Sequence, residues 1–285
     1  SIPLLYAVTV APPKPSKKSW FKWSQSQRAQ RKLFNLLDCI VTNNEPLMDF
    51  VRHAGITTRV EIIPNGVNLQ RFYPADDQQQ RQTIRDALGI AASDIMITTV
   101  GGIMPRKGSH LLLEAWAQLA AEFPHVHLVL VGPRKDLEQP GLKSFRNQLN
   151  KTVSTSGAPE RVHFTGLCKN VEEYQRAADI FVLPSEREGM PNSVLEAMAS
   201  RVAVIVTPFK GLSHDLGTPG THFLLCDRNV TDLASALRLL LENPAQRSQF
   251  ATQGYQWIRE NMNIERSLDR YAALYHELAA THKTV

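Results

Sequence analysis

The chain has 285 residues, 43% of them hydrophobic, and a net charge of +5. This length can bury one large core or two modest ones. The apolar runs are too short for a transmembrane helix. Three cysteines (Cys39, Cys168 and Cys226) lie far apart in the sequence, which argues against a disulfide framework or a metal site and fits a reducing cytosol. Because the chain starts at Ser1, we expect it to be cut from a longer protein, so targeting cannot be read.

The positive charge is concentrated near the N-terminus. Residues 14–37 hold seven basic and no acidic side chains, interrupted by Trp20, Phe21 and Trp23. Basic residues mixed with aromatic ones can mark contact with a membrane surface or an anionic acceptor, here through Lys14–Lys32. The commoner alternative is a solvated loop and the exposed face of a helix. Nucleic acid is not expected as a partner, since no recognised binding module accompanies the segment.

The first elements suggest a small α/β unit. Strands are expected at 4–10, 39–42 and 60–63, and helices at 25–37 and 45–54, the second ending at Gly55. A polar, linker-like stretch follows at 68–80, so we place a domain boundary near 70–75.

A second run of alternating elements begins after this boundary. Strands are expected at 95–100, 126–131, 162–165, 180–183 and 202–206, and helices at 109–123, 141–154, 170–177, 232–241, 245–260 and 265–280. Strands that alternate with helices are typical of a parallel α/β architecture.

The stretch 181–206 carries the strongest functional signal. A buried strand is followed by a turn with Glu188, Gly189 and Pro191, and then by a helix with Ser193 and Glu196 in its first turn. In open α/β sheets, ligands bind at the carboxyl ends of the strands, and a helix N-terminus there offers free N–H groups to an anion. Two carboxylates beside an anion site suit a ligand with hydroxyls and a phosphate, such as a sugar nucleotide.

A purely structural interpretation is also open for these residues. Ser193-x-x-Glu196 and Ser185-x-x-Glu188 both fit a capping box, in which the glutamate satisfies only backbone donors at the start of a helix.

A second candidate site joins the strand at 95–100 to the next helix. Gly101 and Gly102 allow close approach of the backbone, and Arg106 and Lys107 precede a helix whose expected N-cap is Ser109. A helix N-terminus with two cations can hold a diphosphate. The lysine precedes the glycine, which excludes a Walker A loop. The structural alternative is a glycine turn with two solvated charges.

The stretch from Glu188 to Ala199, after Ala178 to Ser185, resembles the E-x7-E motif of family-4 retaining glycosyltransferases, also called glycosyl transferases group 1. Lys107-Gly108 matches the second half of the family's Gly-Arg…Lys-Gly loop. The arginine position of that loop is Gly102 here, so we expect Arg106 to supply the charge. The segments 60–74, 129–132 and 162–166 resemble the end of the family's first domain and the strands beside the nucleotide base.

The resemblance, which spans roughly residues 1–280, implies a GT-B fold. Residues 1–72 would be the last part of the N-terminal Rossmann-like domain, 73–261 a whole C-terminal Rossmann-like donor domain, and 262–285 a helix that crosses back onto the first domain. We expect the given chain alone to bind the donor but to transfer sugar poorly.

By the same resemblance, the protein transfers a sugar from a nucleoside-diphosphate sugar to an acceptor hydroxyl with retention. Glu188 would contact the transferred sugar, Glu196 the ribose, and Arg106 and Lys107 the leaving diphosphate, with no metal or other cofactor. The implied donor-binding residues are Gly102, Arg106, Lys107, Gly189, Met190, Pro191, Asn192, Ser193, Val194 and Glu196, and the implied base-side residues are Gly132, His163 and Leu167. We expect a cytoplasmic protein, with the inner membrane face as the place where the basic segment would act.

Two other functions stay open. A sugar-nucleotide epimerase of the same fold would bind a similar donor without an acceptor. A non-catalytic binding module is the other, because Thr9 stands where the family often has a catalytic histidine. The sequence does not identify the base, the sugar, the acceptor or the linkage.

Overall fold

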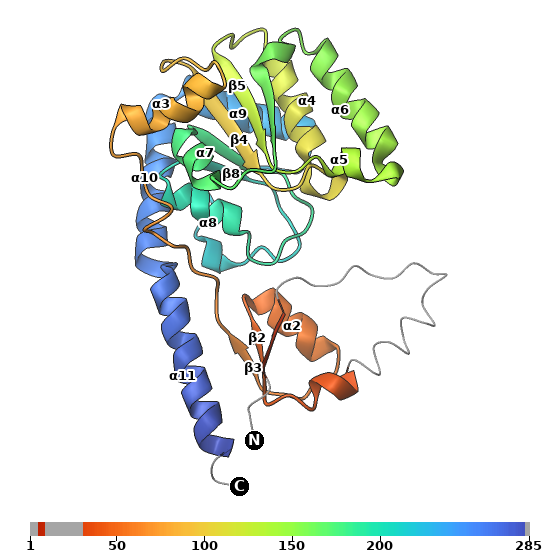
Figure 1. Cartoon of the computed structure of the whole chain (residues 1–285), viewed down its shortest axis with the longest axis vertical. Coiled ribbons are helices and arrows are strands. Elements are labelled where there is room, and N and C mark those ends of the chain that lie inside the picture. The colour runs from red at the N-terminus through yellow and green to blue at the C-terminus, as the bar shows by residue number, and fades with distance from the viewer. Residues whose placement is uncertain (1–4, 9–30, 283–285) are drawn as a thin grey trace.

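The structure is a computed structural model that describes residues 5–8 and 31–282 (Figure 1). A large α/β unit forms the upper part in this view. A small sheet lies below it, and a long C-terminal helix runs beside that sheet. The basic segment, apart from Arg31 and Lys32, and Thr9 lie outside the described residues, so the predictions for them stay predictions.

The small sheet has three parallel strands. They are β1 (Leu5–Val8), β2 (Cys39–Thr42) and β3 (Val60–Ile62), in the order β1-β2-β3. Helix α2 (Glu45–His53) follows β2, and its N-cap Asn44 accepts a hydrogen bond from the Leu47 amide. A side-chain acceptor at this position satisfies one of the free N–H groups of the first turn.

Helix α11 (Ile264–His282) packs against the small sheet. Its Leu274 and Leu278 share a buried cluster with Cys39 and Val41 of β2. The chain therefore leaves the large unit and returns to its own N-terminal part, as Figure 1 shows. Each of these four residues is at most 6% exposed, so the contact removes apolar surface from water on both the helix and the sheet.

The large sheet has six parallel strands in the order β6-β5-β4-β7-β8-β9. They are β4 (Ile95–Val100), β5 (Val126–Val131), β6 (Val162–Gly166), β7 (Ile180–Leu183), β8 (Ala203–Val206) and β9 (Leu224–Leu225). The order runs outward from β4 in one direction and from β7 in the other. This reversal makes the β4–β7 gap the point where a doubly wound sheet opens a crevice at its carboxyl edge.

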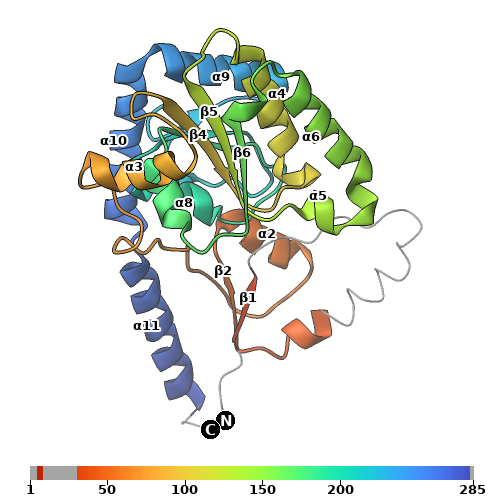
Figure 2. The ribbon, with the colours of Figure 1, turned by 45° about the horizontal axis from the view of Figure 1, so that its top comes forward.

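Helices cover both faces of the large sheet (Figures 1 and 2). One face buries α4 (Ser109–Leu119), α6 (Lys143–Thr155) and α9 (Val230–Glu242). The other face buries α3 (Gln78–Ala87), α7 (Val171–Ala177), α8 (Asn192–Ala199) and part of α10 (Pro244–Asn261). A short helix, α5 (Lys135–Glu138), and several 3-10 turns complete the unit. Burial on both faces explains why the strands are mostly apolar rather than alternating, with Thr98 and His127 among the exceptions.

Helix α3 corrects the expectation of a polar linker at 68–80. The helix begins at Gln78, after the N-cap Asp77, whose side chain accepts from the Gln80 amide. Its composition is polar, but Ile84 and Arg85 are buried. Arg85 donates to Asp179 at 2.5 Å, so a charged contact with the sheet, rather than an apolar stripe, anchors the helix.

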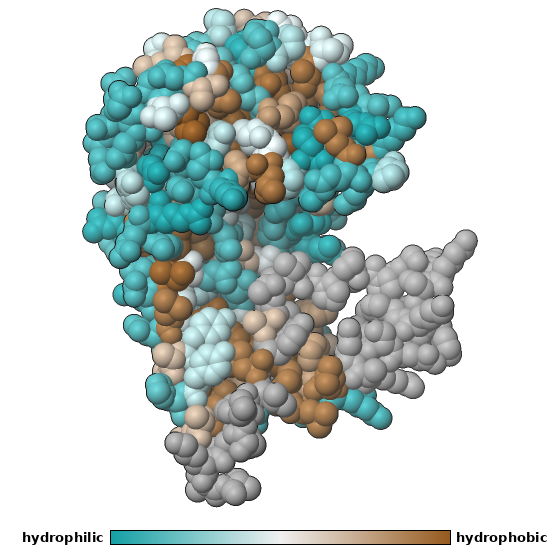
Figure 3. Space-filling model, in the orientation of Figure 1, coloured by the Kyte–Doolittle hydropathy of each residue, from teal (hydrophilic) through white to brown (hydrophobic). Residues whose placement is uncertain are grey.

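The surface differs between the two parts. In Figure 3 the upper unit is mostly hydrophilic on the visible face, and brown residues gather in the lower part. Exposed apolar side chains there include Leu33, Leu36 and Leu268. Among the described residues, none of the helices has the length and the apolar character that spanning a bilayer requires.

Candidate functional site

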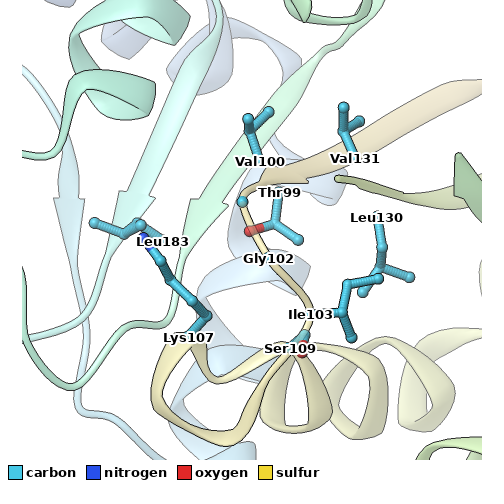
Figure 4. Close-up of a pocket in the computed structure, with 10 residues that line it drawn as sticks. Thr99, Val100, Gly102, Ile103, Lys107, Ser109, Leu130, Val131 and Leu183 are labelled. Carbon is cyan, nitrogen blue, oxygen red and sulfur yellow. The ribbon is translucent and has the colours of Figure 1, made fainter. Parts of the chain in front are cut away.

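The two predicted motifs meet at the carboxyl edge of the large sheet. The loop after β4 carries Gly102 and leads through a 3-10 turn (Pro105–Lys107) into α4. The loop after β7 carries Glu188 and leads into α8. Figure 4 shows the Lys107 side chain reaching from its turn toward Leu183, the last residue of β7. Because β4 and β7 are neighbours in the sheet, the two loops lie side by side at the switch point.

Glu188 is held by three side chains. Lys107 Nζ donates to Glu188 Oε1 at 2.7 Å, and Ser185 Oγ donates to the same oxygen at 2.6 Å. Arg106 Nη1 lies 3.7 Å from this oxygen and donates to the Arg187 carbonyl. The Glu188 side chain is only 11% exposed, so these cations offset the cost of removing its charge from water. The sequence analysis placed Arg106, Lys107 and Glu188 in one site, but it missed Ser185 as a partner.

Ser185 also settles one of the two capping-box interpretations. Its hydroxyl bonds to the Glu188 carboxylate itself, and Glu188 does not begin a helix. The other interpretation, a capping box formed by Ser193 and Glu196, is also not what the structure shows. Helix α8 has Pro191 as its N-cap, with no side-chain cap, so Ser193 is the second helical residue and Glu196 the fifth. Glu196 therefore lies in the second turn, not in the first as predicted.

Glycines let the loops approach each other closely. Gly108 has a φ of 71°, and a Cβ there would lie 2.0 Å from the Pro184 carbonyl oxygen. Gly211 has a φ of 103°, and its Cβ would lie 2.3 Å from the Glu188 carbonyl oxygen. Only glycine fits where φ is positive and backbone lies this near. Gly108 thus fixes the distance between the Lys107 loop and the end of β7.

Two helix N-termini open at this edge. Helix α4 is capped by Gly108, not by Ser109 as predicted, because Ser109 already has helical geometry as the first residue. In α8, the amides of Asn192 and Ser193 have no backbone acceptor within the described chain, whereas the Val194 amide donates to the Pro191 carbonyl at 2.9 Å. Free amides at helix N-termini attract anions. The Val194 amide is thus already bonded within the chain, and its predicted part in binding the sugar donor stays a prediction.

A small hollow lies beside Lys107. It is lined by the loop after β4, including Gly101 and Gly102, and by Ser109 and the end of β5 (Figure 4). The Ser109 hydroxyl oxygen is buried and has no hydrogen-bond partner there. A buried unpaired hydroxyl is costly unless another group or a ligand bonds to it. A Cβ on Gly102 would lie 3.3 Å from Cγ of Lys135, a flexible side chain, and no backbone atom of the described residues beyond its two chain neighbours lies within 4 Å of it, so close backbone approach at Gly102 stays a prediction.

Glu196 differs from Glu188 in having no partner. No hydrogen bond or ion pair reaches its carboxylate from the residues that the structure describes. Burial raises its pKa, while Arg71 counteracts this from a distance and Glu172 adds to it. Arg71 is itself engaged with Glu172, at 2.8 Å. Glu196 is thus a half-buried carboxylate whose hydrogen-bonding capacity is unused.

The three base-side residues are not brought together. Gly132 follows β5 at the carboxyl edge, and its Cβ would lie 2.2 Å from the Gly101 carbonyl oxygen. Leu167 follows β6 at the same edge and is 83% exposed. His163 is the second residue of β6, near the opposite edge. Its Nε2 lies 3.1 Å from Nδ1 of His127. Gly132 and Leu167 can border the crevice, whereas His163 faces another histidine.

Among the described residues, two side-chain contacts connect the small part to this edge, and the sequence analysis predicted neither of them. Asn65 Nδ2 donates to Asn192 Oδ1, at the start of α8, at 2.7 Å. Asn44 Nδ2 donates to the Gly211 carbonyl at 3.2 Å. The carboxyl side of β2 and the turn at Asn65 therefore face the loops that carry Glu188. Residues 5–8 and 31–282 contain no cluster of three histidine, cysteine or acidic side chains suited to a metal ion.

Known proteins share both the sequence pattern and the fold. The family model described as "Glycosyl transferases group 1" matches residues 80–257. The D-inositol 3-phosphate glycosyltransferase of Geodermatophilus obscurus is 29% identical over 248 residues, which are 84% of this chain and 52% of that protein. The mannosylfructose-phosphate synthase of Agrobacterium fabrum is 29% identical over 223 residues, 75% of this chain and 48% of that protein. The chain spans about half the length of these two relatives.

Solved structures agree on the architecture. Anabaena Alr3699/HepE in complex with UDP has a TM-score of 0.79 at 19% identity, over 99% of this chain and 72% of that one. Sucrose-phosphate synthase from Thermosynechococcus elongatus has a TM-score of 0.75 at 25% identity, over 90% of this chain and 62% of that one. These likenesses confirm the GT-B fold expected from the sequence. Because the family model covers more than half of the chain, the protein belongs to the glycosyl transferases group 1 family.

Proposed function

We propose that the protein transfers a sugar from a nucleoside-diphosphate sugar to an acceptor hydroxyl, with retention of the anomeric configuration. One observation carries the proposal. Lys107, from the loop after β4, holds Glu188, from the loop after β7, at 2.7 Å at the switch point of the sheet. A cation, a carboxylate and the N-termini of α4 and α8 thereby converge where doubly wound sheets bind their ligands.

The charges suit a reaction in which a diphosphate leaves. When the bond between the sugar and the diphosphate breaks, negative charge grows on the phosphate oxygens. Lys107, Arg106 and the free amides of Asn192 and Ser193 would stabilise that charge where it develops. Each charge-assisted contact contributes about 1.5–3 kcal/mol. The proposal includes no metal, because these cations and helix dipoles take the role that a metal would have.

Binding of the donor would rearrange the Lys107–Glu188 pair. Phosphate oxygens would compete with Glu188 for the ammonium group of Lys107, whose side chain is 23% exposed. Glu188 would then be free to accept a hydrogen bond from a hydroxyl of the transferred sugar. Glu196, with its unused carboxylate, would accept hydrogen bonds from the ribose. The bound donor thus supplies partners to the two carboxylates of the motif.

The remaining predictions become parts of this proposal. The acceptor, the sugar and the base are not assigned, and the membrane contact through Lys14–Lys32 stays a prediction with the cytoplasmic location. The solved HepE structures hold UDP, UDP with glucose, and UDP-glucose, so we choose UDP-sugars as the first donors to test.

The decisive experiment is an assay with UDP-, GDP- and ADP-sugars and a panel of sugar, inositol and lipid-linked acceptors. We expect a new glycoside, and proton NMR of the first product to show the donor's anomeric configuration. A parallel incubation without acceptor separates transfer from epimerisation, which would yield an altered sugar nucleotide. An inverted product would contradict the mechanism. Calorimetry without binding of UDP, GDP or ADP would contradict the site.

A further inference from the structure

A second cavity, of about 330 Å³, lies where the strands of the large sheet begin. Asp179 and Arg201, which line it, come immediately before the start of β7 and shortly before β8. Lys107 and Glu188 instead follow β4 and β7. Because all strands are parallel, the cavity lies at the amino edge, opposite the candidate donor site. The linker at Pro74 and the start of α10 form its other walls, and Figures 1 and 2 show this linker running beside α10 toward α3.

Four arginines and one carboxylate line this cavity. The arginines are Arg81, Arg176, Arg201 and Arg247, and the carboxylate is Asp179. Asp179 already has three strong partners, since it accepts from Arg81 at 2.6 Å, from Arg85 at 2.5 Å and from the Met96 amide at 2.8 Å. Its charge is therefore used by Arg81 and Arg85. Arg176 has Glu172 nearby, whose pKa it helps to lower, so the arginines left uncompensated are Arg201 and Arg247.

The three arginines other than Arg81 bond only to neutral groups. Arg201 donates to Thr252 Oγ1 at 3.1 Å, and Arg247 donates to the Leu240 carbonyl at 2.7 Å. Arg176 donates to the Arg71 carbonyl at 3.1 Å and lies 4.3 Å from the centre of the Tyr73 ring. Within the described chain, no carboxylate forms an ion pair with any of the three.

Further donors of the same cavity are unused. The Nε of Arg81 is buried and has no acceptor in the described structure. The backbone at the start of α10 adds the positive end of a helix dipole.

Two of the arginines occupy positions that are unfavourable for them. Arg201 has a φ of 57°, in the left-handed region, where a residue with a Cβ is strained. Glycine or asparagine is usual just after a helix end. Arg247 is the fourth residue of α10, and the first turn of that helix has no acidic residue. A cation near a helix N-terminus opposes the dipole, so a bound anion would relieve both Arg247 and the dipole.

We propose that this cavity binds a phosphate group, either as inorganic phosphate or as a phosphomonoester. A phosphate dianion brings nearly two charges and several acceptor oxygens, which match guanidinium groups in pairs. Tyr73 is already stacked under Arg176, and none of the described residues that line the cavity is aromatic, so these residues offer no free ring to a nucleobase. The site is independent of the proposed sugar transfer, and it shares no residue with the donor site.

The test uses two variants and one control. R201N removes a charge while asparagine tolerates the left-handed backbone, and R247Q removes the charge at α10. R259Q, an exposed arginine on the same helix, is the matched control. Calorimetry at fixed ionic strength, set with NaCl, measures binding of inorganic phosphate, of glucose 6-phosphate and, separately, of UDP.

We expect phosphate or glucose 6-phosphate to bind, R201N and R247Q to weaken that binding about tenfold or more each, and R259Q to leave it unchanged. Affinity for UDP should stay the same in all three variants. The tighter of the two phosphate ligands identifies the source of the group. Absence of binding by both ligands would overturn the proposal, and so would equal losses in R201N and R259Q. Loss in a K107A variant without loss in R201N would place the phosphate in the donor site and would also overturn it.

Discussion

The two edges of the large sheet both concentrate positive charge and each holds one carboxylate, but only at the carboxyl edge does that carboxylate pair with the cations proposed to bind the ligand. At the carboxyl edge, Lys107 and Arg106 surround Glu188, which lies 2.7 Å from the lysine. At the amino edge, Asp179 pairs with Arg81 and Arg85, and Arg201 and Arg247 bond only to neutral groups.

This difference shows two ways in which a cluster of positive charges can be tolerated when no anion is bound. A carboxylate that pairs with a lysine keeps the empty site stable, and a phosphate must displace this internal partner to bind. An edge without such a partner has no competitor for the ligand, but it is strained when empty. We therefore expect the two edges to respond oppositely to loss of charge.

Removal of the internal counter-ion should have the largest effect. In E188A and E188Q we expect sugar transfer to fall by about a hundredfold or more, because the contact to the reacting sugar is lost. Binding of UDP should persist or tighten, since Lys107 loses its competitor. Transfer assays and UDP calorimetry check the two expectations, with the exposed neighbour in E186Q as control. Transfer near the wild-type rate in E188A would refute the role of Glu188, and a large loss of UDP affinity would refute the competition.

Loss of the cation itself should have the next largest effect. We expect K107A to weaken UDP binding by about 10- to 100-fold, because one charge-assisted contact is worth about 1.5–3 kcal/mol. Binding of uridine, which has no phosphate, should change little. Calorimetry with both ligands measures the difference, and K151A, an exposed lysine of α6, is the control. Equal losses for UDP and uridine would show that Lys107 supports the fold and not the phosphate.

The unpaired carboxylate at the same edge should give a smaller, pH-dependent effect. Burial raises the pKa of Glu196, so its ionised form, the better hydrogen-bond acceptor, develops only as the pH rises through that raised value. We therefore expect uridine affinity to increase severalfold with pH in that range in the wild type. The E196Q variant should lack the increase. Calorimetry over a pH series compares the two proteins, and parallel curves would exclude Glu196 as a ribose partner.

The free energy of unfolding should depend on the ionisation of Glu196 in the opposite direction to the uridine affinity, and should fall as the pH rises. A raised pKa means that the folded protein holds the proton more firmly than the unfolded chain. Its contribution to stability is therefore largest below the usual carboxyl pKa and is lost as the pH rises through the raised one. Thermal melting of wild type and E196Q over the same pH range isolates this contribution, and it distinguishes a buried unpaired group from a structural cap, whose loss would destabilise at neutral pH.

The fold could be predicted well where the sequence has a clear period. The strands of the large sheet are mostly apolar, which follows from burial on both faces, and the resemblance to the family supplied the GT-B architecture. Helix α3 was missed because a buried ion pair, Arg85 with Asp179, anchors it rather than an apolar stripe. Strand β9 has two residues, too few for any periodic signal.

The sequence predicted which charged residues of the candidate site come together, but not the local backbone geometry around them. Arg106, Lys107 and Glu188 do meet, as the motifs indicated, although their roles stay predictions. The cap at Ser109 was wrong because Gly108, with its positive φ, ends the turn one residue earlier. His163 shares a strand with the segment that borders the crevice, but alternation and register turn it to His127. The arginines of the amino edge come from four separate segments of the chain, so no local pattern could join them.

The smallest expected effect tests the amino edge through its strain. Glycine adopts a positive φ without a Cβ clash, so R201G should raise the stability of the phosphate-free protein by about 0.5–1 kcal/mol. This corresponds to about 1–4 °C in melting temperature for a chain of this size. T252V, which removes only the hydroxyl bonded to Arg201, should not reproduce the gain. Saturating phosphate should then reverse the order, because a ligand stabilises the protein that binds it more tightly. If phosphate raised both melting temperatures equally, Arg201 would not be a ligand contact, and the two edges would differ in their ion pairs but not in what they bind.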